Sequence, residues 1–135
     1  MTDSVLVVGP DGDLCGFVKS LLEDALSVRV SAVSSASEAL QAIDISKPAV
    51  VVLDIIGDGA GGRDSFELIR RLKASPQTEA IPVVILAFDD ARRRALEAGG
   101  ETLLAKEQFS IKRLVDLVRR HMDSSQADTL TQAQG

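Results

Sequence analysis

Hydrophobic residues along this chain occur in short continuous runs that alternate with segments of helical spacing. Continuous apolar runs bounded by turn residues are typical of strands buried inside a parallel sheet. Four such runs predict strands, at 5–8, 50–53, 82–87 and 102–105. The segment 28–32 alternates apolar and polar residues, which predicts a half-exposed strand near a sheet edge. Between these strands, apolar residues recur three and four positions apart and predict helices.

The residues that flank the helical segments predict where the helices begin and end. Serine and aspartate are favoured N-caps because their side-chain oxygens accept hydrogen bonds from the first turn of a helix. The candidate N-caps, in chain order, are Asp13, Ser35 or Ser37, Asp64 or Ser65, and Ser110. The predicted stops are Lys47-Pro48, Ser75-Pro76 and Gly99-Gly100. The glycine-rich segment 57–62 predicts a surface loop before the third helix.

Five strands that alternate with five helices predict an α/β fold. Right-handed crossover connections then give a parallel sheet with helices on both faces, in the doubly wound strand order 2-1-3-4-5. We expect one domain over residues 1–122. The polar segment 123–135 has no hydrophobic period, and it predicts a disordered tail.

Composition and charge narrow the class of protein. Of the 135 residues, 45% are hydrophobic but only 3% aromatic, which favours aliphatic packing of helices on a sheet. The net charge of −5 argues against a nucleic-acid-binding surface. The single cysteine, Cys15, cannot form an internal disulfide, and we expect it to be a partly buried small residue. No apolar run approaches the roughly 20 residues of a membrane span, so a cytoplasmic protein is expected.

The most prominent candidate for chemistry is Asp54, which directly follows the apolar run 50–53. In open α/β sheets, ligands bind outside the carboxyl ends of the strands. The sequence therefore places a carboxylate where a functional site is expected.

The order of these motifs resembles the receiver domain of bacterial response regulators, over about residues 4–122. The motifs are the apolar runs 5–8 and 82–87, the segment 48–54 that ends in Asp54, Ala95-Leu96-Glu97-Ala98-Gly99, and Leu104-Ala105-Lys106. The resemblance implies a flavodoxin-like fold, with Asp54 as the phosphoacceptor for a histidine kinase and Lys106 as the lysine that pairs with the phosphoryl group. In this family Mg²⁺ is held by an acidic pair after the first strand, the phosphoacceptor and a carbonyl that corresponds to Ile56.

Several positions depart from the family pattern. Gly9 and Pro10 stand where the acidic pair is expected, and neither side chain can ligate a hard cation, which requires oxygen donors. Asp11 is the nearest carboxylate, and Mg²⁺ is expected as a cofactor only if Asp11 or Asp58 replaces the lost ligands. Ala87 replaces the switch hydroxyl, and Leu103 replaces the switch aromatic residue.

Two hypotheses of function follow from the resemblance, and a third from the fold class. The favoured one is an atypical receiver (a pseudo-receiver) that acts through protein–protein interaction in a phosphorelay. In it Asp54 pairs with Lys106, and Mg²⁺-dependent phosphorylation is weak or absent. The alternative is a fully functional phosphoacceptor with a divergent metal site. A small nucleotide-binding hydrolase on the same fold is a minority hypothesis, and the protein is not expected to be an enzyme.

The expected partners are a histidine kinase or another signalling protein. In the resembled family, the face built by the helix near 90–98, the strand 102–105 and the last helix binds partners and forms homodimers. Arg92, Arg93 and Arg94 fall on this face and are the candidate docking residues. Neither direct nucleic-acid binding nor membrane insertion is expected.

Overall fold

The computed structural model describes most of the chain. The described residues are 4–10, 12–54, 59–87, 102–105, 110 and 112–122. Among them, no helix is both long enough and apolar enough to cross a membrane.

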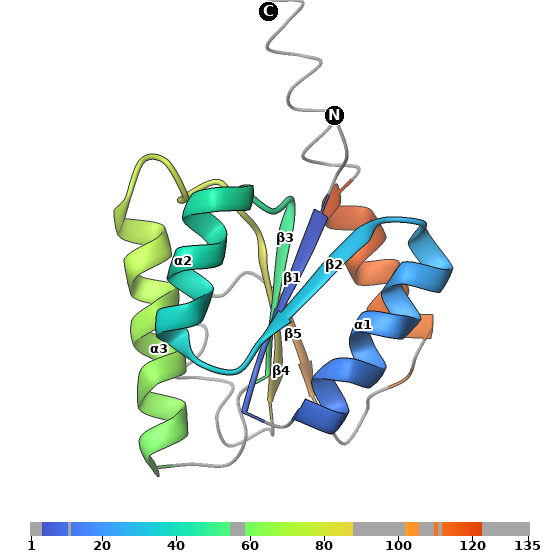
Figure 1. The fold of residues 1–135 in the computed structure, drawn as a ribbon, viewed down its shortest axis with the longest axis horizontal. Helices are drawn as coiled ribbons and strands as arrows, with labels where there is room; N and C mark the ends of the chain where they lie inside the picture. Colours follow the sequence, from blue (N-terminus) through green and yellow to red (C-terminus); the bar gives the residue numbers. More distant parts are fainter. Residues whose placement is uncertain are drawn as a thin grey trace, which may run out of the picture.

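The centre of the molecule is a five-stranded parallel sheet (Figure 1). Its strands are β1 (Ser4–Val8), β2 (Arg29–Val33), β3 (Val50–Asp54), β4 (Val83–Ala87) and β5 (Thr102–Ala105). Their order across the sheet is β2-β1-β3-β4-β5, with each neighbouring pair parallel. This is the order expected from the alternation of strands and helices. The α/β fold with a parallel sheet, predicted from the hydrophobic pattern, is confirmed.

The burial of each strand follows its hydrophobic pattern. All five residues of β3 are buried, as expected for the middle strand of a sheet covered on both faces. In β2 only Val30 is buried, because this strand lies at the edge of the sheet. Parallel pairing places Val8 of β1 opposite Leu53 of β3, so the chain leaves both strands at the same edge.

Two pairs of helices cover the two faces of the sheet. Figure 1 shows α2 (Ala36–Ser46) and α3 (Gly59–Ala74) on one face, with α1 (Gly12–Leu26) and the helix 112–122 on the other. Each pair buries its own apolar cluster. The helix residues of the first cluster include Ala39, Ile43, Phe66, Ile69 and Leu72, and those of the second include Cys15, Val18, Leu22, Leu114 and Val118.

Two predicted caps are confirmed. Ser35 precedes α2 and accepts a hydrogen bond from the Glu38 amide at 3.2 Å. Ser110 likewise accepts a hydrogen bond from the Arg113 amide at 3.1 Å, at the start of the helix 112–122. The prediction for Asp13 was wrong, because α1 begins at Gly12 and Asp13 lies inside its first turn. An acidic residue in that turn is still favourable, since it faces the positive end of the helix dipole.

The predicted start of α3 was also wrong. The helix begins at Gly59, within the segment expected to be a loop, and not at Asp64 or Ser65. Glycine has a poor intrinsic helix propensity, but tertiary packing of an amphipathic face supplies most helical stability in proteins. The buried stripe of Phe66, Ile69 and Leu72 anchors the helix on the sheet, and the helix extends from there into the glycines.

Candidate functional site

Asp54 is the last residue of β3, at the edge where the parallel strands end. It is only 1% exposed, and among the described residues it is the one charged side chain that is buried. Its backbone pairs with Leu86, so Ala87 follows directly on the neighbouring strand β4. On the other side lies the end of β1, because Val8 pairs with Leu53. The carboxylate therefore stands between the ends of β1 and β4.

Gly9 continues the chain beyond β1 and is buried next to Asp54. Its amide donates a hydrogen bond to the Val33 carbonyl at 3.1 Å, and its carbonyl accepts one from the Cys15 thiol at 3.7 Å. A Cβ atom placed on Gly9 would lie 2.9 Å from the Cβ of Asp54 and 3.0 Å from Sγ of Cys15. The turn after β1 thus passes so close to Asp54 and Cys15 that residue 9 has no room for a side chain.

The described residues do not fit the magnesium site implied by the resemblance. Mg²⁺ requires oxygen ligands in near-octahedral geometry. Neither Gly9 nor Pro10 has a side-chain oxygen, and the space beside Gly9 is filled by Asp54 and Cys15. Across the part of the chain that the structure describes, no three acidic, histidine or cysteine side chains are grouped so as to hold a metal ion.

Only some of the predicted site residues fall within the described part of the chain. Gly9 and Asp54 are brought together, and the backbones of Ala87 and Leu103 lie in β4 and β5. The remaining predicted positions lie outside the described residues. They are Asp11, Ile56, Asp58, Arg92, Arg93, Arg94 and Lys106.

A family comparison completes this picture of a carboxylate at the end of the middle strand. Residues 5–119 match the family model described as the response regulator receiver domain. The chain belongs to the response regulator receiver family. The resemblance inferred from the motifs is therefore confirmed, and this receiver domain occupies nearly all of the described chain.

Individual relatives agree with this assignment. The receiver domain is 30% identical over 120 residues to an uncharacterized 14.6 kDa protein of Leptolyngbya boryana, with 87% of this chain and 88% of that protein covered. It is 28% identical over 123 residues to the regulatory protein VanRB of Enterococcus faecalis, covering 89% of this chain but 54% of that protein. The structure of the receiver domain of the Francisella response regulator 1452 superposes with a TM-score of 0.76 at 25% identity, covering 91% of this chain and 98% of that one.

Cys15 is the site residue whose role sequence reasoning missed. It was expected to be partly buried, but it is only 3% exposed, and its thiol donates a hydrogen bond to the Gly9 carbonyl. Its burial has a signal in the sequence, since Cys15, Val18 and Leu22 share one face of α1 at helical spacing. Its contact with the turn after β1 has no such signal, because that contact depends on how α1 docks on the sheet.

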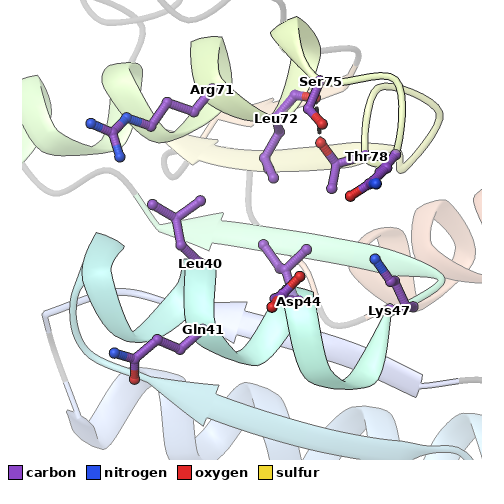
Figure 2. Close-up of a pocket in the computed structure, with 10 residues that line it drawn as sticks. Leu40, Gln41, Asp44, Lys47, Arg71, Leu72, Ser75 and Thr78 are labelled. Atoms are coloured by element: carbon purple, nitrogen blue, oxygen red, sulfur yellow. Dashed lines mark hydrogen bonds between the residues drawn. The ribbon is translucent and has the colours of Figure 1, made fainter.

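A hollow of this receiver domain lies away from Asp54, between α2 and α3. Figure 2 shows Leu40 and Leu72 pointing toward each other across it, with Lys47 and Arg71 at its ends. The cavity has a volume of about 370 Å³. A neighbouring hollow shares Leu40, Gln41 and Arg71 with it, so the two form one open groove along both helices. Among the residues that the structure describes, no predicted site residue lines this groove.

Proposed function

We propose that this receiver domain is an atypical member of its family that acts in two-component signalling through protein–protein contacts. In this proposal, Mg²⁺-dependent phosphorylation of Asp54 is weak or absent. The observation that carries the proposal is the closed space at Gly9. The family's first acidic ligand belongs at this position, which here has neither a side-chain oxygen nor room for a side chain.

The chemistry of phosphoryl transfer explains why this position matters. The transferred group passes through a transition state whose negative charge must be neutralised, and catalysis depends almost entirely on positioning and electrostatics. A carboxylate nucleophile such as Asp54 adds its own negative charge to the site. Without a divalent cation beside Asp54, most of that neutralisation is lost, and the proposed role for Asp54 is a buried ion pair with Lys106.

The alternative keeps Asp54 as a working phosphoacceptor with a divergent metal site. One observation favours it, which is that Asp54 retains the phosphoacceptor's place at the carboxyl end of the middle strand. In this alternative Asp11 or Asp58 would supply the missing oxygen ligands. The two proposals differ in one measurable property, namely whether Asp54 acquires a phosphoryl group when Mg²⁺ is present.

The test follows the mass of the intact protein after incubation with acetyl phosphate and Mg²⁺. The matched control is Asp54→Asn, which keeps the size of the side chain and removes the nucleophile. The positive control is another receiver domain, one that carries the acidic pair, whose phosphorylation shows that the acetyl phosphate is active. We expect wild type and Asp54→Asn each to keep its own unmodified mass. One phosphoryl adduct on wild type that is absent from Asp54→Asn and from wild type with EDTA would establish the alternative.

The proposed partners are a histidine kinase or another signalling protein. Receiver domains act by binding such proteins, and a receiver that is not phosphorylated still has the surface through which it binds them. The docking role of Arg92, Arg93 and Arg94, and a homodimer through the same face, remain predictions from the sequence.

A further inference from the structure

The space beside Gly9 is closed by two different side chains. The position that a Cβ atom on residue 9 would take lies 2.9 Å from the Cβ of Asp54, 3.0 Å from Sγ of Cys15 and 3.3 Å from Oδ2 of Asp54. Non-bonded carbon atoms sit at about 3.5–4.0 Å, so both neighbours overlap any side chain at residue 9. The backbone φ of Gly9 lies outside the left-handed region. A side chain here is therefore excluded by contact and not by backbone conformation.

The two neighbours differ in how far they can give way. Asp54 belongs to β3, a fully buried strand with β1 and β4 on its two sides, and its Cβ moves only with the backbone. Cys15 approaches from α1, and its thiol donates a hydrogen bond to the Gly9 carbonyl at 3.7 Å. Sγ is a single atom beyond Cβ, so replacing the cysteine by alanine removes it completely. Residue 15 is thus the neighbour whose contact a substitution can remove, whereas the closer contact with the Cβ of Asp54 remains.

We propose that Cys15 is a positioning residue of the Asp54 site. Its sulfur lies beside Gly9 and its thiol hydrogen bond ties the turn after β1 to α1, so a side chain at residue 9 and the sulfur of Cys15 compete for the same space. This inference rests on the proposed function and deepens it, because it links the missing metal ligand at residue 9 to the side chain at residue 15. An acidic residue at position 9 would require both a smaller residue at position 15 and a shift of the turn away from the Cβ of Asp54.

Thermal unfolding of four proteins tests this coupling: wild type, Gly9→Ala, Cys15→Ala and the double variant. Alanine adds only the Cβ atom at position 9 and leaves the charge unchanged. Overpacking of this kind lowers the melting temperature of a domain of this size by roughly 5–10 °C. Removing the sulfur should relieve part of this crowding, since contacting residues couple. We therefore expect the melting temperature of the double variant to lie roughly 3 °C or more above the value expected if the two single changes were additive.

Two matched controls separate this contact from general effects. Gly16→Ala adds the same atom in α1, where nothing lies within 4 Å, and it should leave the melting temperature unchanged or raise it. Val18→Ala truncates a buried residue one turn further along α1, which is not among the atoms nearest to Gly9. Its effect should add to that of Gly9→Ala. If Cys15→Ala is equally additive with Gly9→Ala, the proposed coupling is wrong.

A second readout reports position rather than stability. Cys15→Ser keeps a donor for the Gly9 carbonyl, so the backbone amide resonances of Gly9 and Asp54 should stay close to wild type. Cys15→Ala should shift both resonances, and Val18→Ala should leave them in place. Equal spectra at Gly9 and Asp54 for Cys15→Ala and Cys15→Ser would contradict a positioning role.

The outcomes keep this inference apart from the proposed function. If Gly9→Ala fails to fold, recovery of a cooperative transition in the double variant supports the inference, and an unfolded double variant contradicts it. Phosphorylation of wild type at Asp54 would overturn the proposed function but would leave the coupling between residues 9 and 15 as measured.

Discussion

Two single residues favour opposite functions. Asp54 favours a working phosphoacceptor, whereas Gly9, which has no metal-ligating side chain, favours an atypical receiver. Asp54 could be identified from the sequence, because a carboxylate that ends a continuous apolar run has one place to go in a parallel sheet. The absence of a side-chain oxygen at Gly9 was also visible in the sequence. The crowding at Gly9 could not be predicted from the sequence, because it depends on how α1 brings Cys15 against the turn after β1. Contacts between segments leave little trace in a local pattern.

The burial of Cys15 predicts its reactivity. Its side chain is 3% exposed, so a thiol reagent reaches it only when the protein opens locally. We expect the thiol of the native protein to react with a disulfide reagent roughly 100-fold or more slowly than that of the urea-unfolded protein. The matched control is Cys15→Ala combined with Phe17→Cys, which moves the thiol to a position on α1 that is 49% exposed in wild type. Equal rates for wild type and this variant in native buffer would contradict the observed burial.

At the scale of elements, the strands were easier to predict than the start of α3. A continuous apolar run has one stable environment, the inside of a covered sheet, and β1, β3 and β4 follow from it. The start of α3 at Gly59 is set by competition between weak local preferences and packing at the far end of the helix. Because glycines give no local preference for helix, the start of α3 was predicted too late in the sequence.

The cap of α2 gives a prediction at this scale. Ser35→Ala removes the acceptor for the Glu38 amide, and it should lower the free energy of unfolding by about 1 kcal/mol. Ser37→Ala, an exposed change inside the same helix, should leave stability unchanged or raise it, because alanine is the better helix former. Urea denaturation with an unchanged m-value measures both. The cap assignment fails if the two variants have the same midpoint.

At the scale of the whole molecule, the sheet separates two apolar clusters. Leu22 lies in the cluster under α1 and the helix 112–122, whereas Ile69 lies in the cluster under α2 and α3. Both side chains are fully buried. The alternating pattern of the chain predicted this layered arrangement, because every crossover helix must cover one face or the other.

This layering predicts additive mutations across the sheet. Leu22→Ala should cost about 2–5 kcal/mol of unfolding free energy and Ile69→Val about 0.5–1.5 kcal/mol, from lost burial and the cavities left behind. Because the two residues lie on opposite faces, the double variant should show the sum within about 0.5 kcal/mol. Chemical denaturation of the four proteins measures this. A coupling above about 1 kcal/mol would mean that the two clusters respond as one unit.

In the proposed function, Asp54 occupies the phosphoacceptor's position but lacks the magnesium site that serves it in the family. The most direct measurement is a titration of the wild-type protein with Mg²⁺, followed through the backbone amide resonances of Gly9, Leu53 and Asp54. A non-chelating monovalent salt of equal ionic strength serves as the control. If Asp54 has no magnesium site, Mg²⁺ should move these resonances no more than the salt does. A saturable shift at Asp54 and Gly9 with Mg²⁺ alone, reversed by EDTA, would contradict it.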